Sequence, residues 1–440
     1  MKVILIIGAG RSSASLIRYL LKESETSGWK IRVGDLDLQL AENKVNNHSN
    51  GQAFKIDLSD DVSMNREVEG ADLVISMLPA TMHMKVIKLC LKYKKSILTP
   101  SYIPQELWDL DTEAKNAGIA ILGEMGADPG IDHMSAMRIV HEIQGKGGEI
   151  TSFKSYTGGL IAPESDDNPW NYKVTWNPRN IVLAGAGATA KFRENGLLKY
   201  IPYTRLFEDI ETIEVGDAGK FDGYANRDSL GYKKAYGMEN VKTLLRGTLR
   251  KEGFCAAWGA LVKIGLTDDG FMLEDPANTS WKDLTASFLP RVHANIEMEL
   301  QRRFSFSDEV MTKLKWLGIF EEESIGINQG SPAVALQALI EKKLKLDDGD
   351  KDMIVMNHDF EYLLEGKSHK LQSSMVCIGD DTTYTAMAKT VGMPIAIAAK
   401  LMLNGALKMS GVHLPILPEI YNPVLNELEL YGVHFNEKVE

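Results

Sequence analysis

The stretch MKVILIIGAGRSS, residues 1–13, decides the fold that we predict for this chain. Its apolar run VILII ends at Gly8 and leads through a Gly-Ala-Gly turn into the amphipathic segment SASLIRYLLKES, residues 13–24. The apolar run is too short for the hydrophobic part of a signal peptide, so we interpret it as a strand. A strand that passes through Gly-x-Gly into a helix is typical of the first βα unit of a dinucleotide-binding domain.

This glycine-rich turn is the first predicted site. Gly8 permits the tight turn, and Gly10 removes a side chain that would block the pyrophosphate of a dinucleotide. The helix that opens at Arg11 and Ser12 points its N–H groups at the anion. Ser13 replaces the third glycine of the fingerprint and is small enough for packing between helix and strand. We therefore predict these five residues as cofactor ligands.

The second predicted strand, IRVGDLD, ends in a carboxylate that bears on the choice of cofactor. Asp35 stands 25 residues after Gly10, where an acidic residue accepts hydrogen bonds from the adenosine ribose and repels a 2′-phosphate. Asp37 competes for this role, and Arg32 lies too early, within the strand. Because no Arg or Lys occurs between Arg32 and Lys44, we expect NAD as the cofactor, with NADP less favoured.

Alternating strands and helices continue to about residue 125. Apolar runs such as ADLVISMLP and SILTPS are separated by helical periods, which predicts βαβ units and a parallel sheet with helices on both faces. Asp57 closes the third strand, where we expect it beside the adenine, and Leu78 follows the fourth strand; we assign both to the cofactor site. Residues 1–125 with about 390–440, which include the helical segment PIAIAAKLMLNG, are predicted to form a Rossmann dinucleotide-binding domain.

Beyond residue 135 the pattern changes. EITSFKSYTGGL predicts a strand that ends in a Gly-Gly turn, and residues 158–180 are predicted to form a long loop. KTLLRGTLR and KDMIVMNHDFEYLLEG predict strands of a second, mixed sheet. Apolar spacings of three and four, as in residues 283–304, predict helices, and a Pro-rich tail is expected to end the chain. The predicted fold is α/β, with a mixed-sheet substrate and dimerisation domain (126–265 and 351–389) and a helical insertion (266–350).

Composition narrows the classes of partner. The 440 residues include 49 Lys and Arg against 60 Asp and Glu, a net charge of -11, which argues against nucleic acid and anionic membranes as partners. No segment reaches the ~18 uninterrupted apolar residues of a membrane span. Cys90, Cys255 and Cys377 are scattered and lack CxxC spacing, which predicts no metal site and a reducing, cytoplasmic compartment.

Several longer motifs carry a resemblance to a known family. They are ADLVISMLPATMHMKVIKLCLK (71–92), EMGADPGIDH (124–133), GGLIAPE (158–164), NRDS (226–229) and RGTLR (246–250). Because these motifs occur together in this order, the chain resembles the saccharopine dehydrogenase (saccharopine reductase) family, glutamate-forming type, from residue 1 to about residue 425. The resemblance implies that saccharopine and water are converted to L-glutamate and 2-aminoadipate 6-semialdehyde with a nicotinamide dinucleotide, in lysine metabolism.

The resemblance also implies the substrate ligands. Saccharopine carries three carboxylates, so its pocket on an acidic protein needs fixed cations, for which the Arg fork is best suited. The family places Arg227 and Arg246 at the substrate, and Gly247 and Thr248 follow Arg246 as further donors. At the end of the ILTPSY strand, Ser101 and Tyr102 supply neutral hydrogen bonds.

The EMGADPGIDH motif is expected to carry polar groups into the cleft between the two domains. Asp128 is predicted to bind the cationic amine of the substrate, with general base as its competing role. Hydride removal requires a neutral amine, and we consider Tyr102 and Asp128 as catalytic candidates. Asp132 and His133 are interpreted as helix-start and packing residues.

Two further positions and three alternatives complete the prediction. Thr157 replaces a Cys that we associate with many family members, which excludes a thiol there, and Trp176 is expected at the nicotinamide. The alternatives are an NADP-dependent saccharopine reductase of lysine biosynthesis, an imine reductase such as one that makes carboxynorspermidine, and a non-catalytic dinucleotide-binding scaffold. Both the NRDS and the RGTLR arginines are present, which disfavours the second. We expect saccharopine as the small-molecule partner, and a homodimer.

Overall fold

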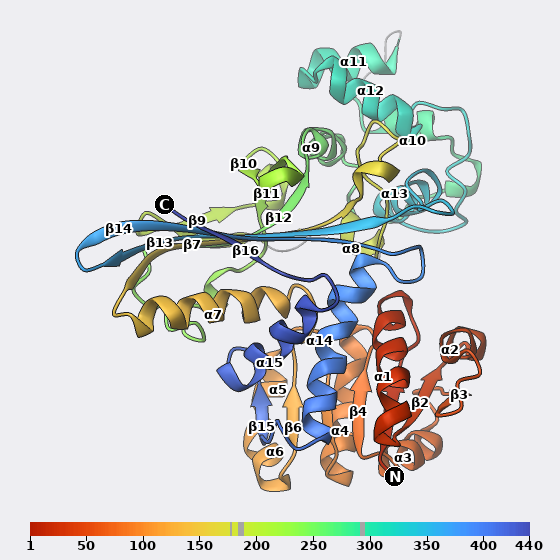
Figure 1. Cartoon of the computed structure of the whole chain (residues 1–440). Coiled ribbons are helices and arrows are strands. Elements are labelled where there is room, and N and C mark those ends of the chain that lie inside the picture. Colours follow the sequence, from red (N-terminus) through yellow and green to blue (C-terminus); the bar gives the residue numbers. More distant parts are fainter. Residues whose placement is uncertain (177, 184–188, 291–294) are drawn as a thin grey trace. The chain divides into compact units, whose positions relative to one another are not determined.

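The apolar runs of the N-terminal part form one seven-stranded parallel sheet in the order β15-β6-β5-β4-β1-β2-β3 (Figure 1). Strand β1 lies between β2 and β4, so the strand order reverses there and the carboxyl ends of β1 and β4 border the switch point where such sheets bind ligands. The strands are β1 (Val3–Ile7), β2 (Lys30–Asp35), β3 (Gly51–Lys55), β4 (Leu73–Ser76), β5 (Ser96–Leu98), β6 (Ala120–Leu122) and β15 (Gly411–His413).

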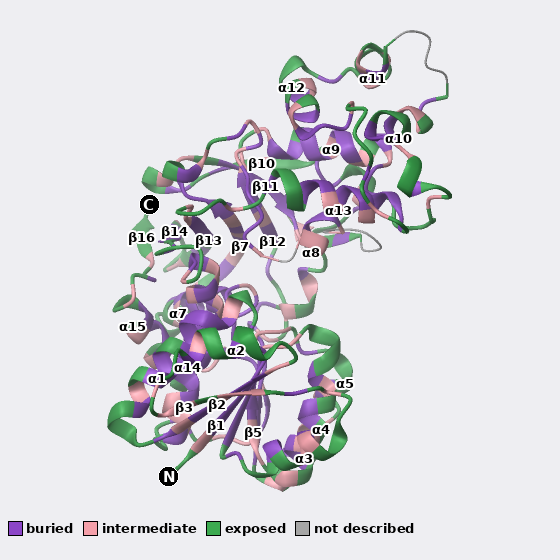
Figure 2. Ribbon diagram, turned by 90° about the vertical axis from the view of Figure 1, so that its right-hand side faces the viewer, coloured by how far each residue is buried: buried purple, intermediate pink, exposed green. Residues whose placement is uncertain are grey.

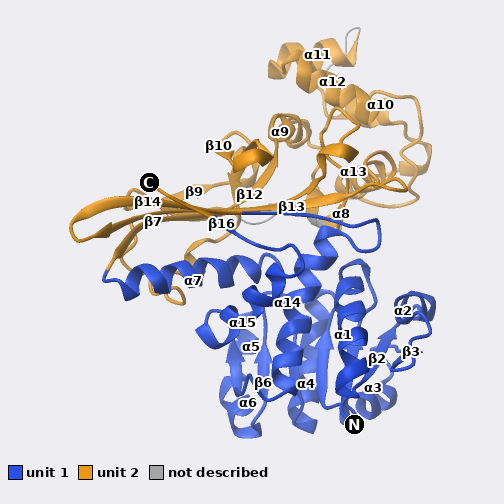
Figure 3. Ribbon diagram, in the orientation of Figure 1, with its two compact units in different colours: residues 1–147, 375–436 blue, residues 148–374, 437–440 orange. Residues whose placement is uncertain are grey.

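The computed structural model describes residues 1–176, 178–183, 189–290 and 295–440. These form two compact units, Met1–Gly147 with Met375–Asn436 and Gly148–Ser374 with Glu437–Glu440 (Figure 3). The division assigns residues 126–147 to the first unit, whereas the domain boundaries given above begin the substrate domain at residue 126. The predicted loop 158–180 and helical stretch 283–304 include residue 177 and residues 291–294, which lie outside the described residues.

Helices cover the parallel sheet because their apolar stripes face buried strands. Ile4, Leu5 and Ile6 have no exposed surface, and Figure 2 shows the strands of this unit mainly in the colour of buried residues. The helices are η1 (Arg11–Ser13), α1 (Ala14–Ser27), α2 (Leu38–Val45), α3 (Asp61–Glu69), η2 (Ala80–Met82), α4 (His83–Tyr93), α5 (Gln105–Trp108), α6 (Asp111–Ala117), α7 (Ile131–Gly145), α14 (Ala386–Leu403) and α15 (Pro418–Glu429).

Helix α14 packs against the start of α1. A side chain at Gly392 would lie 3.0 Å from the carbonyl oxygen of Ser12 and 3.1 Å from the amide nitrogen of Leu16, so the two helices approach at backbone distance. Among the described residues, α14 is the one helix long and apolar enough to cross a membrane by length and composition; 61% of it is buried, and it contacts α1 and α15.

The second unit is built on a nine-stranded mixed sheet in the order β10-β11-β12-β7-β13-β14-β16, with β8 on β12 and β9 on β8. Strand β12 runs parallel to β7, and β13 runs antiparallel to β7. The strands are β7 (Glu149–Ile161), β8 (Ala190–Glu194), β9 (Leu197–Ile201), β10 (Ile210–Glu214), β11 (Lys220–Ala225), β12 (Thr243–Lys251), β13 (Asp352–Leu364), β14 (Lys367–Ile378) and β16 (Asn436–Val439). The α/β fold with a parallel and a mixed sheet is therefore confirmed.

The helices of the second unit include short ones between its strands and longer ones from residue 254 to residue 343. They are η3 (Pro163–Ser165), α8 (Pro178–Val182), η4 (Tyr203–Arg205), η5 (Gly216–Ala218), η6 (Leu230–Tyr232), α9 (Phe254–Ile264), η7 (Pro276–Asn278), α10 (Trp281–Ser287), α11 (Ile296–Phe304), α12 (Asp308–Leu317) and α13 (Pro332–Lys343).

Two local predictions are wrong. Strand β7 continues through Gly158 to Ile161, so the Gly-Gly pair makes no turn. Gly158 is a glycine for packing, because a side chain there would lie 2.8 Å from the Cβ of Leu249 on β12. The Pro-rich tail contains β15 and α15, since Pro418 occupies the first turn of α15, where a proline needs no N–H partner.

Candidate active site

The glycine-rich turn of the first unit has the geometry predicted for Gly8. Its φ is +104°, and a Cβ there would lie 2.8 Å from the carbonyl oxygen of Met77. The N–H of Gly8 donates to the carbonyl oxygen of Gly34 over 2.8 Å. Both the backbone angle and the crowding therefore require glycine, and the turn is fixed to β2 and to the end of β4.

Gly10 is a glycine for a different reason. Its φ of -65° suits any residue, and a Cβ there would meet no atom within 4 Å. Neither conformation nor packing requires glycine here, and the open face has the room that a phosphate needs in turns of this kind. Ser13 is buried and its hydroxyl donates to the carbonyl oxygen of Gly10 over 2.8 Å, while Ser12 is half-buried and Arg11 is exposed.

Asp35 braces this loop. Its Oδ2 accepts the N–H of Ala9 over 2.6 Å, and its Oδ1 accepts the N–H of Asp37 over 2.9 Å. Burial lowers the pKa of Lys44 on α2, while the Asp35 carboxylate acts in the opposite direction. A half-buried ammonium group therefore lies close to the end of β2, although Lys44 follows Asp35 by nine residues in the sequence.

Asp57 and Leu78, the other two cofactor residues predicted in this unit, follow the ends of β3 and β4. Asp57 is exposed, and its Oδ1 accepts the N–H of Ser59 over 2.8 Å and its hydroxyl over 2.7 Å, which lowers the pKa of Asp57. Leu78 is half-buried and follows Met77, whose carbonyl borders Gly8.

Ser101 follows β5 and is held by a buried histidine. His83 Nε2 lies 2.7 Å from Ser101 Oγ, and His83 Nδ1 lies 2.8 Å from Ser76 Oγ. Burial lowers the pKa of His83 to about 4. Sequence reasoning missed His83; its place just after a buried strand, in MLPATMH, was the available signal.

Tyr102 stands between two backbone anchors that Glu124 provides. The N–H of Glu124 donates to the carbonyl oxygen of Ser101 over 3.0 Å, and its Oε1 accepts the N–H of Ile103 over 2.9 Å. Glu124 is only 2% exposed, and its Oε2 lies 2.8 Å from Nε2 of the buried His133. The Tyr102 side chain is 42% exposed, and its hydroxyl donates to Oδ1 of Asp128 over a long 3.5 Å.

Asp128 lies in a tight loop before α7. It is half-buried and precedes a cis peptide bond to Pro129. Gly130 has φ +150°, and its N–H donates to Asp132 Oδ1 over 2.6 Å. Asp132 and His133 thus serve the first turn of α7 and the buried contact with Glu124, and the loop presents Asp128 beside Tyr102.

In the second unit, three polar side chains alternate along one face of β12. Arg246, Thr248 and Arg250 are two residues apart, so they point to the same side of the strand. Arg246 is 7% exposed, and its guanidinium carbon lies 4.6 Å from the centre of the Tyr232 ring. Thr248 is half-buried and pairs with Thr157 on β7.

The other predicted residues of the second unit, Gly247, Arg227 and Trp176, do not lie on this face of β12. Gly247 points to the opposite face, where a Cβ would lie 2.4 Å from the Tyr156 ring, so its glycine serves packing. Arg227 is exposed, has φ +39° and accepts the N–H of Lys191 at its carbonyl oxygen. Trp176 is half-buried, in the segment before α8.

Arg250 is a buried cation that sequence reasoning missed. It is 4% exposed, its Nη1 donates to the carbonyl oxygen of Leu249, and its Nε has no hydrogen-bond partner. Its guanidinium carbon lies 5.4 Å and 5.5 Å from the ring centres of Tyr172 and Phe254. In the part of the chain that the structure describes, no carboxylate pairs with it, so its charge favours an anion nearby. The Arg-x-x-x-Arg spacing on a strand was the signal.

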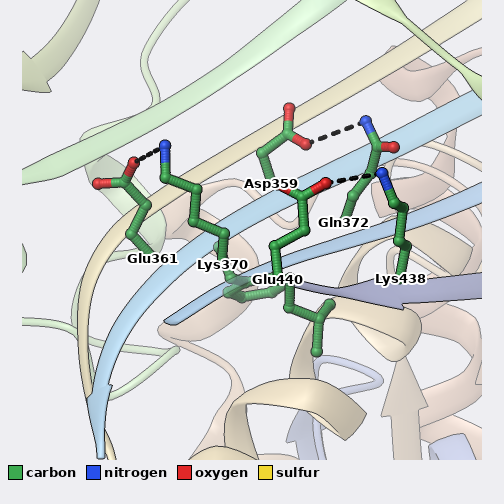
Figure 4. A pocket seen from close by; sticks show the side chains of 8 residues that line it. Asp359, Glu361, Lys370, Gln372, Lys438 and Glu440 are labelled. Carbon is green, nitrogen blue, oxygen red and sulfur yellow. Dashed lines mark hydrogen bonds and ion pairs between the residues drawn. The ribbon is translucent and has the colours of Figure 1, made fainter. Parts of the chain in front are cut away.

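A polar groove on β13, β14 and β16 contains none of the predicted site residues. Within it Lys370 pairs with Glu361, Lys438 pairs with Glu440, and Gln372 donates to Asp359 (Figure 4). The two lysines of the groove are thus paired with glutamates, and the Asp359 carboxylate accepts from the side-chain amides of Asn357 and Gln372.

Within the first unit, the structure brings the glycine turn together with Asp35, and Tyr102 with Ser101 and Asp128. Within the second unit, it brings Arg246 and Thr248 onto one strand face and leaves Gly247 on the other.

Two family models match the chain: the saccharopine dehydrogenase NADP binding domain over residues 4–122 and the saccharopine dehydrogenase C-terminal domain over residues 126–433.

The chain belongs to the saccharopine dehydrogenase family. It is 34% identical over 453 residues to saccharopine dehydrogenase [NADP(+), L-glutamate-forming] of Pyricularia oryzae, covering 100% of this chain and 99% of that protein. It is also 34% identical to alpha-aminoadipic semialdehyde synthase of Arabidopsis thaliana, of which it covers 45%.

Solved structures agree with the family. Apo histidine-tagged saccharopine dehydrogenase (L-Glu forming) from Saccharomyces cerevisiae matches with a TM-score of 0.90 and 30% identity over 100% of both chains. Homospermidine synthase from Legionella pneumophila matches with a TM-score of 0.56 and 9% identity, which shows a shared fold alone.

The prediction that NAD is the preferred cofactor is wrong. The matching family model is named for NADP, and the saccharopine dehydrogenases of Pyricularia oryzae and Schizosaccharomyces pombe are named NADP(+) enzymes. The physical reason lies at Asp35, whose carboxylate is engaged by the backbone N–H groups of Ala9 and Asp37. In addition, Lys44 lies outside the sequence segment that lacks cations, but the fold of α2 returns it to the vicinity of Asp35.

Proposed function

We propose that this chain is an NADP-dependent, L-glutamate-forming saccharopine dehydrogenase of lysine metabolism. The observation that carries the proposal is the match over the whole chain to relatives that bear this name, at 34% and 32% identity and 99% of their length. The chain has the polar ADPGIDH, NRDS and RGTLR motifs as well as the glycine turn. A scaffold that only binds a dinucleotide would not need these motifs, so their presence disfavours that alternative.

The residues of the first unit fit a dinucleotide. The open face at Gly10 leaves room for a phosphate, and the N–H groups at the start of η1 and α1 would face it, as in other turns of this kind. Arg11, which is exposed on the turn, and Lys44, near the end of β2, would supply positive charge to a 2′-phosphate. When bound, the oxidised nicotinamide supplies the hydride acceptor.

The substrate groups of saccharopine match the polar residues of both units. Arg227 and Arg246 would bind carboxylates as bidentate forks, and buried Arg250 adds positive potential on the face of β12 that carries Arg246 and Thr248. Asp128 with Tyr102 would bind the secondary amine of saccharopine and take its proton, because the amine must be neutral to release a hydride.

Product analysis tests the proposal. Purified protein with saccharopine and NADP should form L-glutamate and 2-aminoadipate 6-semialdehyde in equal amounts with NADPH, as followed by absorbance and mass spectrometry. Lysine and 2-oxoglutarate as products would show cleavage on the other side of the nitrogen. Reduction of NADP without consumption of saccharopine would also contradict the proposal.

A further inference from the structure

The buried ring of His83 contacts three hydroxyl groups at or just after the ends of neighbouring strands. Ser76 at the end of β4 and Thr99 just after β5 are 0% and 2% exposed, and His83, the first residue of α4, is 5% exposed. Nδ1 lies 2.8 Å from Ser76 Oγ, and Nε2 lies 2.7 Å from Ser101 Oγ. Thr99 Oγ1 lies 3.0 Å from Nε2 and 3.3 Å from Nδ1.

The surroundings decide which nitrogen carries the proton. Burial lowers the pKa of His83 to about 4, so the ring is neutral near pH 7 and has one donor and one acceptor. The side chain of Ser76 hydrogen-bonds, among the described residues, to this ring alone. If Nδ1 were protonated, the buried Ser76 proton would lack an acceptor, which is costly. Thr99 Oγ1 reaches either nitrogen, at 3.0 Å from Nε2 and 3.3 Å from Nδ1, so Ser76 decides between the two tautomers. Nδ1 therefore accepts from Ser76, and Nε2–H donates to Ser101.

This arrangement fixes what Ser101 can offer. Its Oγ accepts from the ring, so its own proton points to another acceptor. Its backbone is held as well, since its N–H donates to Thr99 Oγ1 over 3.3 Å and its carbonyl oxygen accepts from Glu124. A carboxylate is an acceptor only and needs such a donor.

We propose that His83 is a positioning residue: anchored by Ser76, it keeps the Ser101 hydroxyl as a hydrogen-bond donor to a carboxylate of the substrate. The inference rests on the proposed function, which supplies a substrate with carboxylates, and it adds a residue that acts through Ser101. It also predicts which half of the imidazole matters. The Nε2 side is needed for substrate binding, and the Nδ1 side serves to hold the ring.

Two substitutions separate the two sides of the ring. His83→Gln places an amide near the position of Nε2, where its NH2 group can donate to Ser101, whereas His83→Asn reaches only the position of Nδ1 and Ser76. We expect His83→Asn to raise the KM for saccharopine roughly tenfold or more, because a hydrogen bond to a charged group is lost. His83→Gln should stay within roughly threefold of wild type, and the KM for NADP should change little in both.

A double substitution and a control complete the experiment. In a Ser101→Ala background, His83→Asn should raise the KM for saccharopine no further. His141→Asn, which alters a half-buried histidine bonded to Tyr421 on another helix of the same unit, should leave this KM unchanged. Melting curves identify variants that fail to fold.

The outcomes are distinct. Equal losses for His83→Asn and His83→Gln in folded protein, or losses that add to those of Ser101→Ala, would overturn the role of His83 while leaving the proposed function intact. A wild-type protein without saccharopine-dependent turnover would overturn the proposed function and, with it, this inference.

Discussion

Single buried side chains determine which polar groups of the site keep a fixed position. Glu124, 2% exposed, holds the backbone on both sides of Tyr102, and His83 holds the side chain of Ser101. Such groups are stable only while fully hydrogen-bonded, because an unsatisfied buried polar group costs about 1–3 kcal/mol. Protonation of the buried His83 ring therefore links the geometry of the site to pH.

The buried ring of His83 predicts one part of the acid sensitivity. Its pKa is lowered from 6.5 to about 4 by burial, so between these values the unfolded chain binds a proton that the folded chain excludes. The free energy of unfolding should be fully supported above pH 6.5 and fall as the pH drops to about 4, by roughly 3 kcal/mol in total. Urea unfolding of wild type and His83→Gln across this window tests it. Parallel pH dependences of the two proteins would contradict the assignment.

Lys44 should contribute to the choice of nucleotide. Its ammonium group lies near Asp35, and a cation beside a 2′-phosphate contributes on the order of 1–2 kcal/mol. We expect Lys44→Met to lower kcat/KM for NADP roughly tenfold and to leave the value for NAD nearly unchanged. Lys22→Met, on the exposed face of α1, is the matched control. Equal losses with both nucleotides would remove Lys44 from the phosphate site.

The buried charge of Arg250 should lower the free energy of unfolding while it strengthens the binding of the substrate. A buried charge without a carboxylate partner is costly, so replacement by an apolar side chain of similar length is often neutral or stabilising. Arg250→Met should keep the free energy of unfolding within about 1 kcal/mol of wild type, or raise it, and should raise the KM for saccharopine roughly tenfold. A large loss of stability with an unchanged KM would mean that Arg250 serves the fold alone.

At the scale of elements, period and turn chemistry were readable from the sequence, whereas close packing was not. The first strand, its glycine turn and Asp35 at the end of β2 could be placed because each follows local rules. The Gly-Gly pair in β7 was misread as a turn, since Gly158 packs against Leu249 on β12, a strand that is adjacent in the sheet but far away in the sequence. His83 and Arg250 escaped notice because the burial of each side chain is a property of the folded unit.

Close packing of β7 and β12 predicts a sensitive glycine. A methyl group at Gly247 would lie 2.4 Å from the Tyr156 ring and 2.7 Å from the carbonyl oxygen of Tyr224, so Gly247→Ala should lower the free energy of unfolding by about 1–3 kcal/mol. Gly145→Ala, where α7 ends in open space, should leave it unchanged or slightly higher. Denaturant unfolding measures both. Equal stability of the two variants would show that the ring of Tyr156 moves aside.

For the whole molecule, the sequence could establish the fold class and the family, but the cofactor preference inferred from one carboxylate was wrong. The charge at the end of β2 depends on Lys44 as well as on Asp35, and their proximity is a property of the folded α2.

The quaternary state remains a prediction at this scale. We expect a two-fold dimer, which is the commonest state of soluble oligomers. Light scattering at assay concentrations should give about twice the 48.8 kDa of one chain. A mass near that of a single chain at all concentrations would contradict a dimer.

The most direct test of the proposed activity is the steady-state rate of saccharopine oxidation with each nucleotide. We predict saccharopine-dependent reduction of NADP, with kcat/KM for NADP at least roughly tenfold above that for NAD, because the positive charges of Arg11 and Lys44 favour the 2′-phosphate. A preference for NAD, or no saccharopine-dependent reduction of either nucleotide by folded protein, would contradict the proposed NADP-dependent activity.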